Sequence, residues 1–366
     1  TNTLEDISYG ECNRMEKARH HYVPRFYLRN FSICKRRISL YVNASNRFVE
    51  HASIKDQAFK HHLYGSGTDV EEFLAYIEDQ VAPIIKGIID TDKLPLADTI
   101  EYQSILYFMI LSHARDTRHA DSVNTFLDAQ MKQIFTMEKK HGVDNLDGID
   151  ISDYKISFDM PNLYSIQDAH KTLSYILDLK TLLIISDCDR LFITSDSPMT
   201  KYNAFFVERG YANLGYGYGS VGIQLFLPIS PRHCLLVYDG IMYKALGSVN
   251  GVIHINKSKT IDEMNRLFYL NSYNFLYFCP CTSFKYIEKI VTENIEKKKT
   301  RKLITKFGSE DSMFIGFHPH QVVSRVNIPY LQIDPRYYSI PFLNQLSGPL
   351  RPYVIRIMQK EGRFKG

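Results

Sequence analysis

Tryptophan is absent from this 366-residue chain, and cysteine is scarce, with six residues. So few cysteines in a chain of this length do not form the disulfide framework of a small secreted protein, so we expect reduced thiols and a cytoplasmic location. The best candidate for a membrane span, Ile105 to Leu111, is far shorter than the roughly 20 apolar residues that a spanning helix needs. The first ten residues also lack the apolar stretch of a secretory signal.

The overall composition is that of a globular protein. Apolar residues make up 45% of the chain and charged residues 23%, which excludes wholesale disorder. The length predicts about two domains, or a single large one. The net charge of +4 is too small to require a nucleic-acid partner by itself.

Charge is distributed unevenly along the chain. Eight basic residues and one acid lie between Arg14 and Arg37, whereas nine aspartates lie between Asp144 and Asp189. The basic segment is compatible with an anion-binding site, with nucleic acid or with a protein partner, and equally with a solvated surface. Charge alone leaves these alternatives open.

Apolar periodicity predicts the elements of the fold. Helices are expected over about 69–88, 99–140, 166–179, 260–278 and 283–302, and strands over 37–42, 47–49, 181–186, 190–194, 222–227 and 233–238. We therefore predict an α+β fold in which a helical N-terminal half packs on a small, mostly antiparallel sheet. The chain would form a single compact unit at 1–300, with a proline-rich C-terminal extension at 301–366 packed on it as a peripheral tail.

The densest polar cluster lies between Arg19 and Phe31. Pro24 suits the start of a helix, which would place Arg25 and Arg29 one turn apart, with His20, His21 and Tyr22 at the donor-rich end. Two guanidinium groups there could bind phosphate, and a histidine could act as a general acid or base. The alternative is that the aromatic residues pack inward and the arginines pair with surface carboxylates.

Two further motifs carry acidic or basic side chains. Ser195 and Asp196 follow a predicted strand, which is a common position for catalytic or metal-binding groups, although Asp196 could instead form a local Asx turn. Arg115 lies on the second long helix and would turn inward only toward a buried anion or a carboxylate such as Glu78. A structural ion pair is the simpler interpretation.

The segment from His20 to Phe31 resembles the opening signature of the bacterial family filed as domain of unknown function 4238. Further similarities follow in order along the chain: His62-Leu63-Tyr64, Glu78, Gln103, Arg115, Phe192 to Pro198, Phe226 to Pro231, and Asn265. The resemblance covers roughly residues 17–278. It implies a shared fold of unknown chemistry, and by context a gene of mobile elements or defence islands.

Other motifs are weaker. Cys279 and Cys281 lack zinc spacing and are expected to be core thiols, and the pair His318 and His320 is too isolated to define a metal site. The segment from Gly215 to Gly219 has the glycine content of a phosphate loop without its lysine or its strand-to-helix context.

From these motifs we predict a phosphodiester-cleaving nuclease that acts in cellular defence or as a toxin. The alternative is a non-catalytic subunit that binds nucleic acid or a protein from the same defence locus, and a third interpretation is chemistry on a small nucleotide beneath the glycine-tyrosine segment. The predicted site residues are His20, His21, Tyr22, Arg25, Arg29, Glu78, Arg115, Ser195 and Asp196. The histidines would transfer protons, the arginines would stabilise phosphate, and Asp196 with Glu78 would position groups or hold a divalent ion.

This interpretation requires that His21, Arg25, Arg115 and Asp196 line one pocket. The positive surroundings of His21 would lower its pKa and keep its ring neutral. The sequence defines neither a metal site nor a cofactor.

Overall fold

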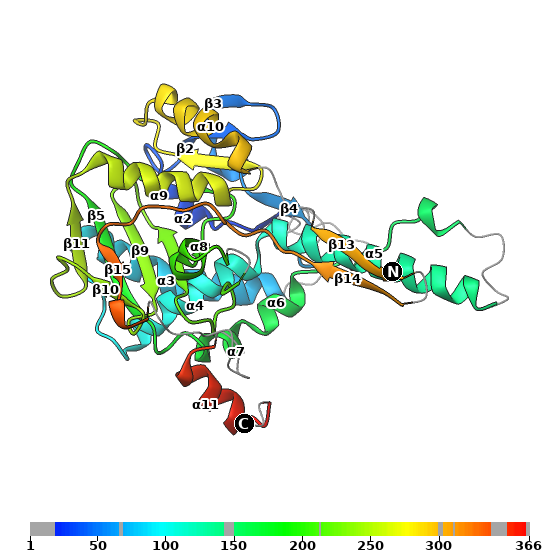
Figure 1. Cartoon of the computed structure of the whole chain (residues 1–366). Coiled ribbons are helices and arrows are strands. Elements are labelled where there is room, and N and C mark those ends of the chain that lie inside the picture. Colours follow the sequence, from blue (N-terminus) through cyan, green and yellow to red (C-terminus); the bar gives the residue numbers. More distant parts are fainter. Residues whose placement is uncertain are drawn as a thin grey trace, which may run out of the picture.

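A five-stranded sheet lies between two layers of helices in the computed structural model, which describes residues 19–65, 69–142, 150–211, 214–298, 303–309, 312–337 and 350–363 (Figure 1). Its strands are β5 (Lys180–Ser186), β7 (Thr200–Tyr202), β8 (Gln224–Pro228), β9 (His233–Tyr238) and β11 (Val252–Ile255). The order is β11-β5-β9-β8-β7, and only β11 and β5 run parallel. The predicted α+β class and mostly antiparallel sheet are confirmed.

Alternate residues of this sheet enter two separate cores. Leu183, Leu225 and Leu235 pack against the first helical layer. Leu182 and Leu236 face the opposite core, which contains α9 (Ser258–Asn271). Since successive side chains of a strand point to opposite faces, a sheet covered on both sides needs apolar residues at consecutive positions, as in Leu182 to Ile185 of β5 and Cys234 to Val237 of β9.

The first helical layer comes from the N-terminal half of the chain, as predicted. It contains α3 (Asp69–Thr91) and α4 (Ile100–Ala114), and α4 is buried around most of its circumference. The single helix predicted over 99–140 is wrong, because α4 ends at Ala114 and α5 (Thr117–Lys140) begins after Asp116. The Asp116 carboxylate caps α5 by accepting the backbone N–H of Arg118 at 2.8 Å.

A second sheet joins distant segments at the edge of the body. Its strands are β2 (Arg37–Val42), β3 (Arg47–Ser53), β6 (Thr194–Ser195) and β12 (Phe275–Phe278), in the order β3-β2-β12-β6. The predicted hairpin of β2 and β3 is confirmed. The helix predicted to run to residue 278 is wrong, because α9 ends at Asn271 and the following apolar segment enters this sheet between β2 and β6.

Shorter elements complete the body. They are β1 (Arg19–His21) paired with β4 (Phe59–His61), α2 (Arg25–Arg29), α6 (Leu163–Gln167), α7 (Ala169–Ser174), α8 (Ala204–Glu208), α10 (Phe284–Lys298) and 3₁₀ turns at Ile54–Asp56, Ile151–Asp153 and Pro335–Tyr337. The helix predicted over 166–179 is divided between α6 and α7. The run predicted as a strand over 190–194 contributes only its last residue to β6.

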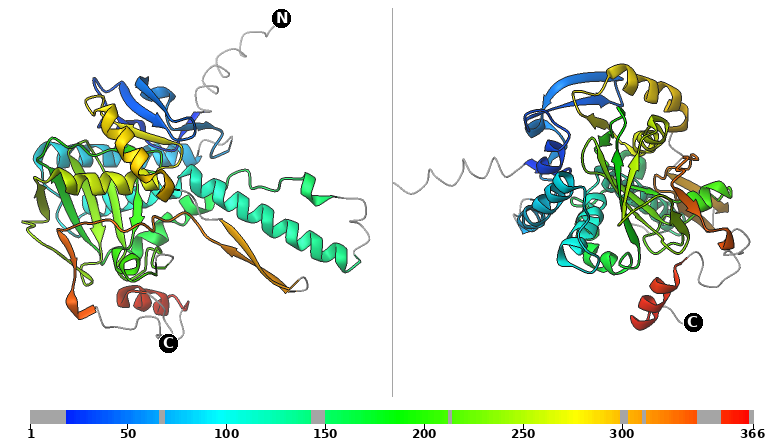
Figure 2. Two further views of the ribbon diagram at one scale, coloured as in Figure 1. Left: turned by 45° about the horizontal axis from the view of Figure 1, so that its top comes forward. Right: turned by 90° about the vertical axis from the view of Figure 1, so that its left-hand side faces the viewer.

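An arm projects from the body (Figure 2). It consists of the distal part of α5, the returning segment near residue 156, and the hairpin of β13 (Ile304–Ser309) with β14 (Ser312–Phe317). The chain then returns across the body, where β15 (Leu331–Ile333) pairs with β10 (Tyr243–Ala245), and ends in α11 (Pro352–Lys360). Part of the basic segment, Arg14 and Lys17, and the tail prolines 341 and 349 lie outside the described residues.

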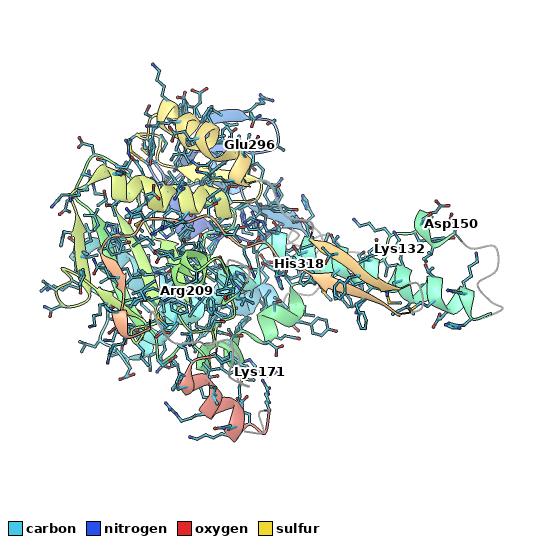
Figure 3. The ribbon with its side chains drawn as sticks, in the orientation of Figure 1. Lys132, Asp150, Lys171, Arg209, Glu296 and His318 are labelled. Carbon is cyan, nitrogen blue, oxygen red and sulfur yellow. A yellow bond between two sulfur atoms is a disulfide. The ribbon has the colours of Figure 1, made fainter. Side chains whose placement is uncertain are left out.

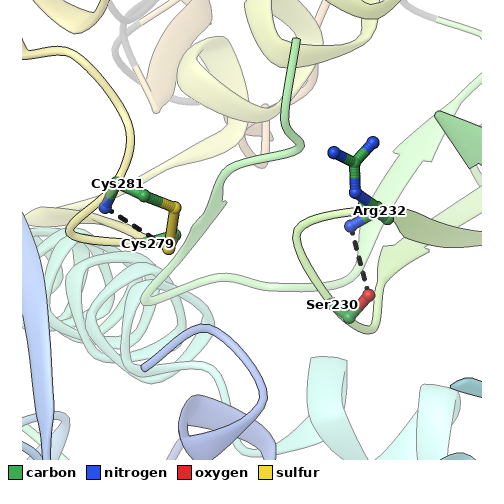
Figure 4. Close-up of a disulfide and its surroundings, with 4 residues drawn as sticks. All are labelled: Ser230, Arg232, Cys279 and Cys281. Atoms are coloured by element: carbon green, nitrogen blue, oxygen red, sulfur yellow. Dashed lines mark hydrogen bonds between the residues drawn. A yellow bond between two sulfur atoms is a disulfide. The ribbon is translucent and has the colours of Figure 1, made fainter. Parts of the chain in front are cut away.

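Two findings concern the expected location of the protein. Across the described ranges, the helices are too short or too polar to cross a membrane. Cys279 and Cys281, expected as core thiols, are joined in a disulfide just beyond β12 (Figure 4). Cys281 is exposed rather than part of the core, which corrects that expectation. Cys34, Cys188 and Cys234 are free.

Candidate functional site

The segments that carry the family resemblance meet at the buried hydroxyl of Tyr27. This hydroxyl donates to the carbonyl of Pro228 and lies 2.7 Å from Thr194 Oγ1. Asn265 fixes the segment that leads into β6, because its Oδ1 accepts the N–H of Ile193 at 3.0 Å and its Nδ2 donates to the carbonyl of Leu191 at 2.8 Å. These side chains hold the fold together and do not face open space.

Both predicted proton-transfer histidines are held by hydrogen bonds within the fold. His20 Nδ1 accepts the N–H of Tyr64 at 3.1 Å, and its Nε2 lies 3.2 Å from a Glu71 carboxylate oxygen. His21 Nδ1 donates to the carbonyl of Gln57 at 3.0 Å. Burial, followed by the charge of Arg25, lowers the pKa of His21 to about 4. The predicted direction of that shift is confirmed, although burial rather than positive charge is its leading cause.

Arg115 turns inward to Glu78, as the ion-pair interpretation predicted. The Arg115 side chain is 1% exposed, and its Nη1 donates to Glu78 Oε1 at 2.7 Å. Arg25 lies nearby and is partly buried, whereas Arg29 is exposed at the end of α2. The two arginines of α2 therefore differ in their exposure to solvent.

Asp196 holds the turn that precedes β12. Its two carboxylate oxygens accept the N–H groups of Tyr273 at 2.9 Å and Asn274 at 2.6 Å, while Ser195 Oγ accepts the N–H of Ser197 at 3.1 Å. Burial raises the pKa of Asp196 to about 6 against the opposing effect of these N–H donors. Its partners are remote in sequence, so the local Asx turn is wrong. Burial and the nearby Asp196 raise the pKa of Tyr22.

Several of the nine predicted side chains lie within electrostatic reach of one another, since, in addition to burial, the charges of Arg25 and Arg115 both lower the pKa of His21 and that of Asp196 raises the pKa of Tyr22. In the part of the chain that the structure describes, three cavities stand out, and none of the nine predicted side chains lines any of them. Two of these cavities, of about 650 and 430 Å³, adjoin at the start of α3, where both are lined by Asp69, Val70 and Leu163. The third cavity differs from these two because several basic and imidazole side chains line it.

This third cavity, of about 470 Å³, lies at the junction of α4 and α5. We call it the histidine–lysine cavity. Its charged and imidazole side chains come from four segments and are His113, Asp116, Arg118, His119, Lys201 and His320. Residues 214–217 and Phe317 form further walls. A pocket in which several titratable groups with shifted pKa values converge is the usual form of a catalytic or anion-binding site.

Lys201, on β7, brings a positive charge that forms no ion pair with a carboxylate of the described residues. Its ammonium nitrogen lies 5.0 Å from the centre of the Tyr218 ring, and no residue of the described chain accepts a hydrogen bond from it. Burial lowers the pKa of Lys201 to about 8, with an opposing contribution from Asp116. The side chain is therefore mainly protonated near neutral pH and available to an anion.

His113 and His119 bring two imidazole rings to the same cavity. The ring centres lie 5.9 Å apart, and His119 Nε2 lies 2.8 Å from Ser165 Oγ. Burial lowers the pKa of both histidines, and the charge of Lys201 adds to that effect. Both rings are therefore neutral near pH 7, the state in which an imidazole can accept a proton, while the same burial and charge weaken them as bases.

The other basic groups of this region bind the carbonyl end of α9. Arg118 donates to the carbonyl of Ser272, His320 Nε2 donates to that of Leu270 at 3.1 Å, and Lys298 donates to that of Tyr269 at 2.7 Å. A helix C-terminus carries negative partial charge, so cations are stabilised there. Arg118 and His320 thus line the cavity with part of their donor capacity already used.

Sequence reasoning missed His113, His119 and Lys201. They stand alone in the sequence, without a motif, and only the break between α4 and α5 brings the two histidines toward β7. Asp116 as a helix cap was the one local signal for that break. In the described ranges, no three His, Cys, Asp or Glu side chains are placed to hold a metal ion.

Comparison with known proteins gives one match. The family model described as a protein of unknown function (DUF4238) matches residues 19–282. Curated proteins and solved structures give no match to the chain.

Proposed function

This chain belongs to DUF4238, a family of proteins of unknown function, and we propose from its histidine–lysine cavity that it is a phosphodiester-cleaving enzyme. The observation that carries the proposal is the convergence of two neutral imidazoles and an unpaired ammonium in one cavity of about 470 Å³. A neutral imidazole can take a proton, and a fixed cation beside it can stabilise the charge of a phosphate ester, which supports the proposal.

The proposed reaction is attack of water on phosphorus. His113 takes the proton of the attacking water, because its ring makes no hydrogen bond with a described residue and faces the cavity. As the new P–O bond forms, the bond to the leaving oxygen breaks, and Lys201 donates a proton to that oxygen. Arg118 and the Lys201 ammonium stabilise the phosphate charge.

The size of the cavity favours a narrow substrate. Pockets of roughly 300–1,000 Å³ accept ligands the size of a nucleotide. The substrate we propose is therefore a single-stranded nucleic-acid end or a free nucleotide. Tyr216 and Phe317 line the cavity and supply aromatic surface for a base.

We also propose that the protein acts in the cytoplasm, in cellular defence or as a toxin. The family resemblance and the proposed substrate support this role. Growth arrest on induced expression, absent in a His113→Ala strain, would support it. Growth of both strains at the same rate would count against a toxin.

The enzymatic proposal is tested with labelled single-stranded RNA and DNA and with free nucleotides, each with magnesium and with a chelator. His113→Ala should lower turnover by about a hundredfold or more while the far-ultraviolet circular dichroism stays unchanged. His254→Ala is the matched control, since that ring is exposed and pairs only with Asp187. Equal turnover of the wild type and His113→Ala would overturn the assignment.

A non-catalytic binding subunit is the second candidate, and the projecting arm favours it. The rings of Phe307 and Phe314 stack at 5.9 Å on the hairpin, with 56% and 61% of these residues exposed. Figure 3 marks Lys132 and Asp150 along the arm and His318 near its base. Exposed aromatic rings of this kind bind bases or a protein surface. Binding of single-stranded RNA without turnover, lost in Phe307→Ala, would support this candidate.

A further inference from the structure

Arg351 is a buried arginine near the C-terminus, outside the segment that matches the family. It is 1% exposed and forms a two-pronged ion pair with Asp178, through Nε at 2.9 Å and Nη2 at 3.0 Å. Nη2 also donates to the carbonyl of Tyr175. A guanidinium of this geometry fixes the position of its partners better than a lysine would.

The remaining donors of Arg351 bind the glycine-tyrosine loop, which we define as residues 214–222. Nη1 donates to the carbonyls of Tyr218 and Ser220, both at 2.9 Å, and the backbone N–H donates to the carbonyl of Gly219 at 2.9 Å. Val354 of α11 packs so closely that a Cβ on Gly219 would lie 2.8 Å from its Cγ1. The C-terminal segment is thus joined to this loop by hydrogen bonds and by packing.

The same loop contacts the two side chains to which we assign chemistry. The Tyr218 ring meets the His113 ring edge-on at 5.9 Å between centres, and it lies 5.0 Å from the Lys201 ammonium. The neighbouring residues Gly215 and Gly217 line the cavity itself. A continuous set of contacts therefore runs from Asp178 through Arg351 and Tyr218 to the cavity.

We propose that Arg351 is a positioning residue that fastens the glycine-tyrosine loop against His113 and Lys201, so that the C-terminal segment supports one wall of the cavity from behind. The catalytic part of this inference rests on the proposed function. The mechanical part, that Arg351 holds the glycine-tyrosine loop in place, is independent of the proposed function because it concerns only how well the loop is ordered.

Amide hydrogen exchange of the full chain tests the mechanical part. In Arg351→Met, amides of the glycine-tyrosine loop should exchange about tenfold faster or more, while those of β5 and β9 keep their protection. Gly219→Val should act in the same way from the other side of the contact, and Arg351→Lys should restore part of the protection. Arg356→Met is the matched control, because that arginine lies on α11 with an exposed side chain. Unchanged loop exchange in both Arg351→Met and Gly219→Val, or equal acceleration throughout the sheet, would overturn the proposal.

Binding of inorganic phosphate, measured by calorimetry, and turnover of single-stranded RNA link the loop to the cavity. Arg351→Met should weaken phosphate binding by about fivefold or more, and Arg351→Lys should recover part of it. Faster loop exchange with wild-type phosphate affinity would show that the loop does not position the site. Faster loop exchange in a protein whose wild type turns over no substrate would instead contradict the proposed function and leave Arg351 as a structural clasp.

Discussion

Replacing Lys201 by methionine should stabilise the protein while it removes anion binding. The folded protein keeps this ammonium in a partly closed cavity, where no carboxylate of the described residues forms an ion pair with it, and burial lowers its pKa from 10.5 to about 8. A charge held in that way costs folding free energy, which an apolar side chain of similar length does not. Function and stability are therefore in conflict at this residue.

The size and sign of the effect follow from the two pKa values. Below about pH 8 both states bind the proton and the full cost applies, whereas between about 8 and 10.5 only the unfolded chain keeps it, so stability rises with pH. A difference of 2.5 units at 1.36 kcal/mol each gives at most about 3 kcal/mol, an upper limit because the side chain is partly exposed. The free energy of unfolding of Lys201→Met should exceed that of the wild type by up to this amount near pH 7 and by little near pH 10.5.

Urea denaturation of the wild type and the variant at both pH values measures this difference, and other titrating groups cancel in the comparison. Lys285→Met, at an exposed position on α10, is the control and should show no such dependence. Calorimetry with inorganic phosphate near pH 7 should show binding to the wild type alone. The reasoning would be refuted if Lys201→Met were less stable than the wild type near pH 7. It would also be refuted if the difference in their free energies of unfolding did not shrink as the pH rises.

Three further changes test the structural contacts. Arg115→Ala leaves the Glu78 carboxylate without its partner and should lower the free energy of unfolding in urea by about 3 kcal/mol; a loss below about 1 kcal/mol would contradict a tight pair. Tyr27→Phe should cost about 1–3 kcal/mol by the same measurement and leave turnover unchanged, because its hydroxyl only joins structural segments. His21→Ala should cost about 1–2 kcal/mol with unchanged turnover, so a large loss of turnover at full stability would return the catalytic role to His21.

The spacing of apolar residues predicted the long helices and strands, because the buried positions recur at regular intervals along each of them. The start of α3 at Asp69 and the strands β5 and β9 follow from apolar spacing and capping alone. The break between α4 and α5 was missed because apolar residues continue on both sides of it, and a helix cap such as Asp116 is a weaker signal than that stripe. The strand β12 was missed because its apolar run directly follows a helix of the same character.

The site was harder to predict than the fold. Arg115 could be assigned to Glu78 because a buried guanidinium needs an anion, which is a local physical requirement. Nothing local marks His113, His119 and Lys201, since their pKa values depend on neighbours supplied by the tertiary structure. Polar residues with a strong motif proved to be those that the fold uses for its own hydrogen bonds, as with Tyr27 and Asp196.

The helix α5 is, in mechanical terms, a lever. Its first turn carries Arg118 and His119 in the cavity, and its 24 residues at 1.5 Å each reach about 36 Å outward along the arm (Figure 2). A tilt of about 3° about the capped end at Asp116 moves the far end by roughly 2 Å and the cavity side chains by only tenths of an ångström. A contact that displaces the far end of the arm by this amount would therefore leave Arg118 and His119 almost in place.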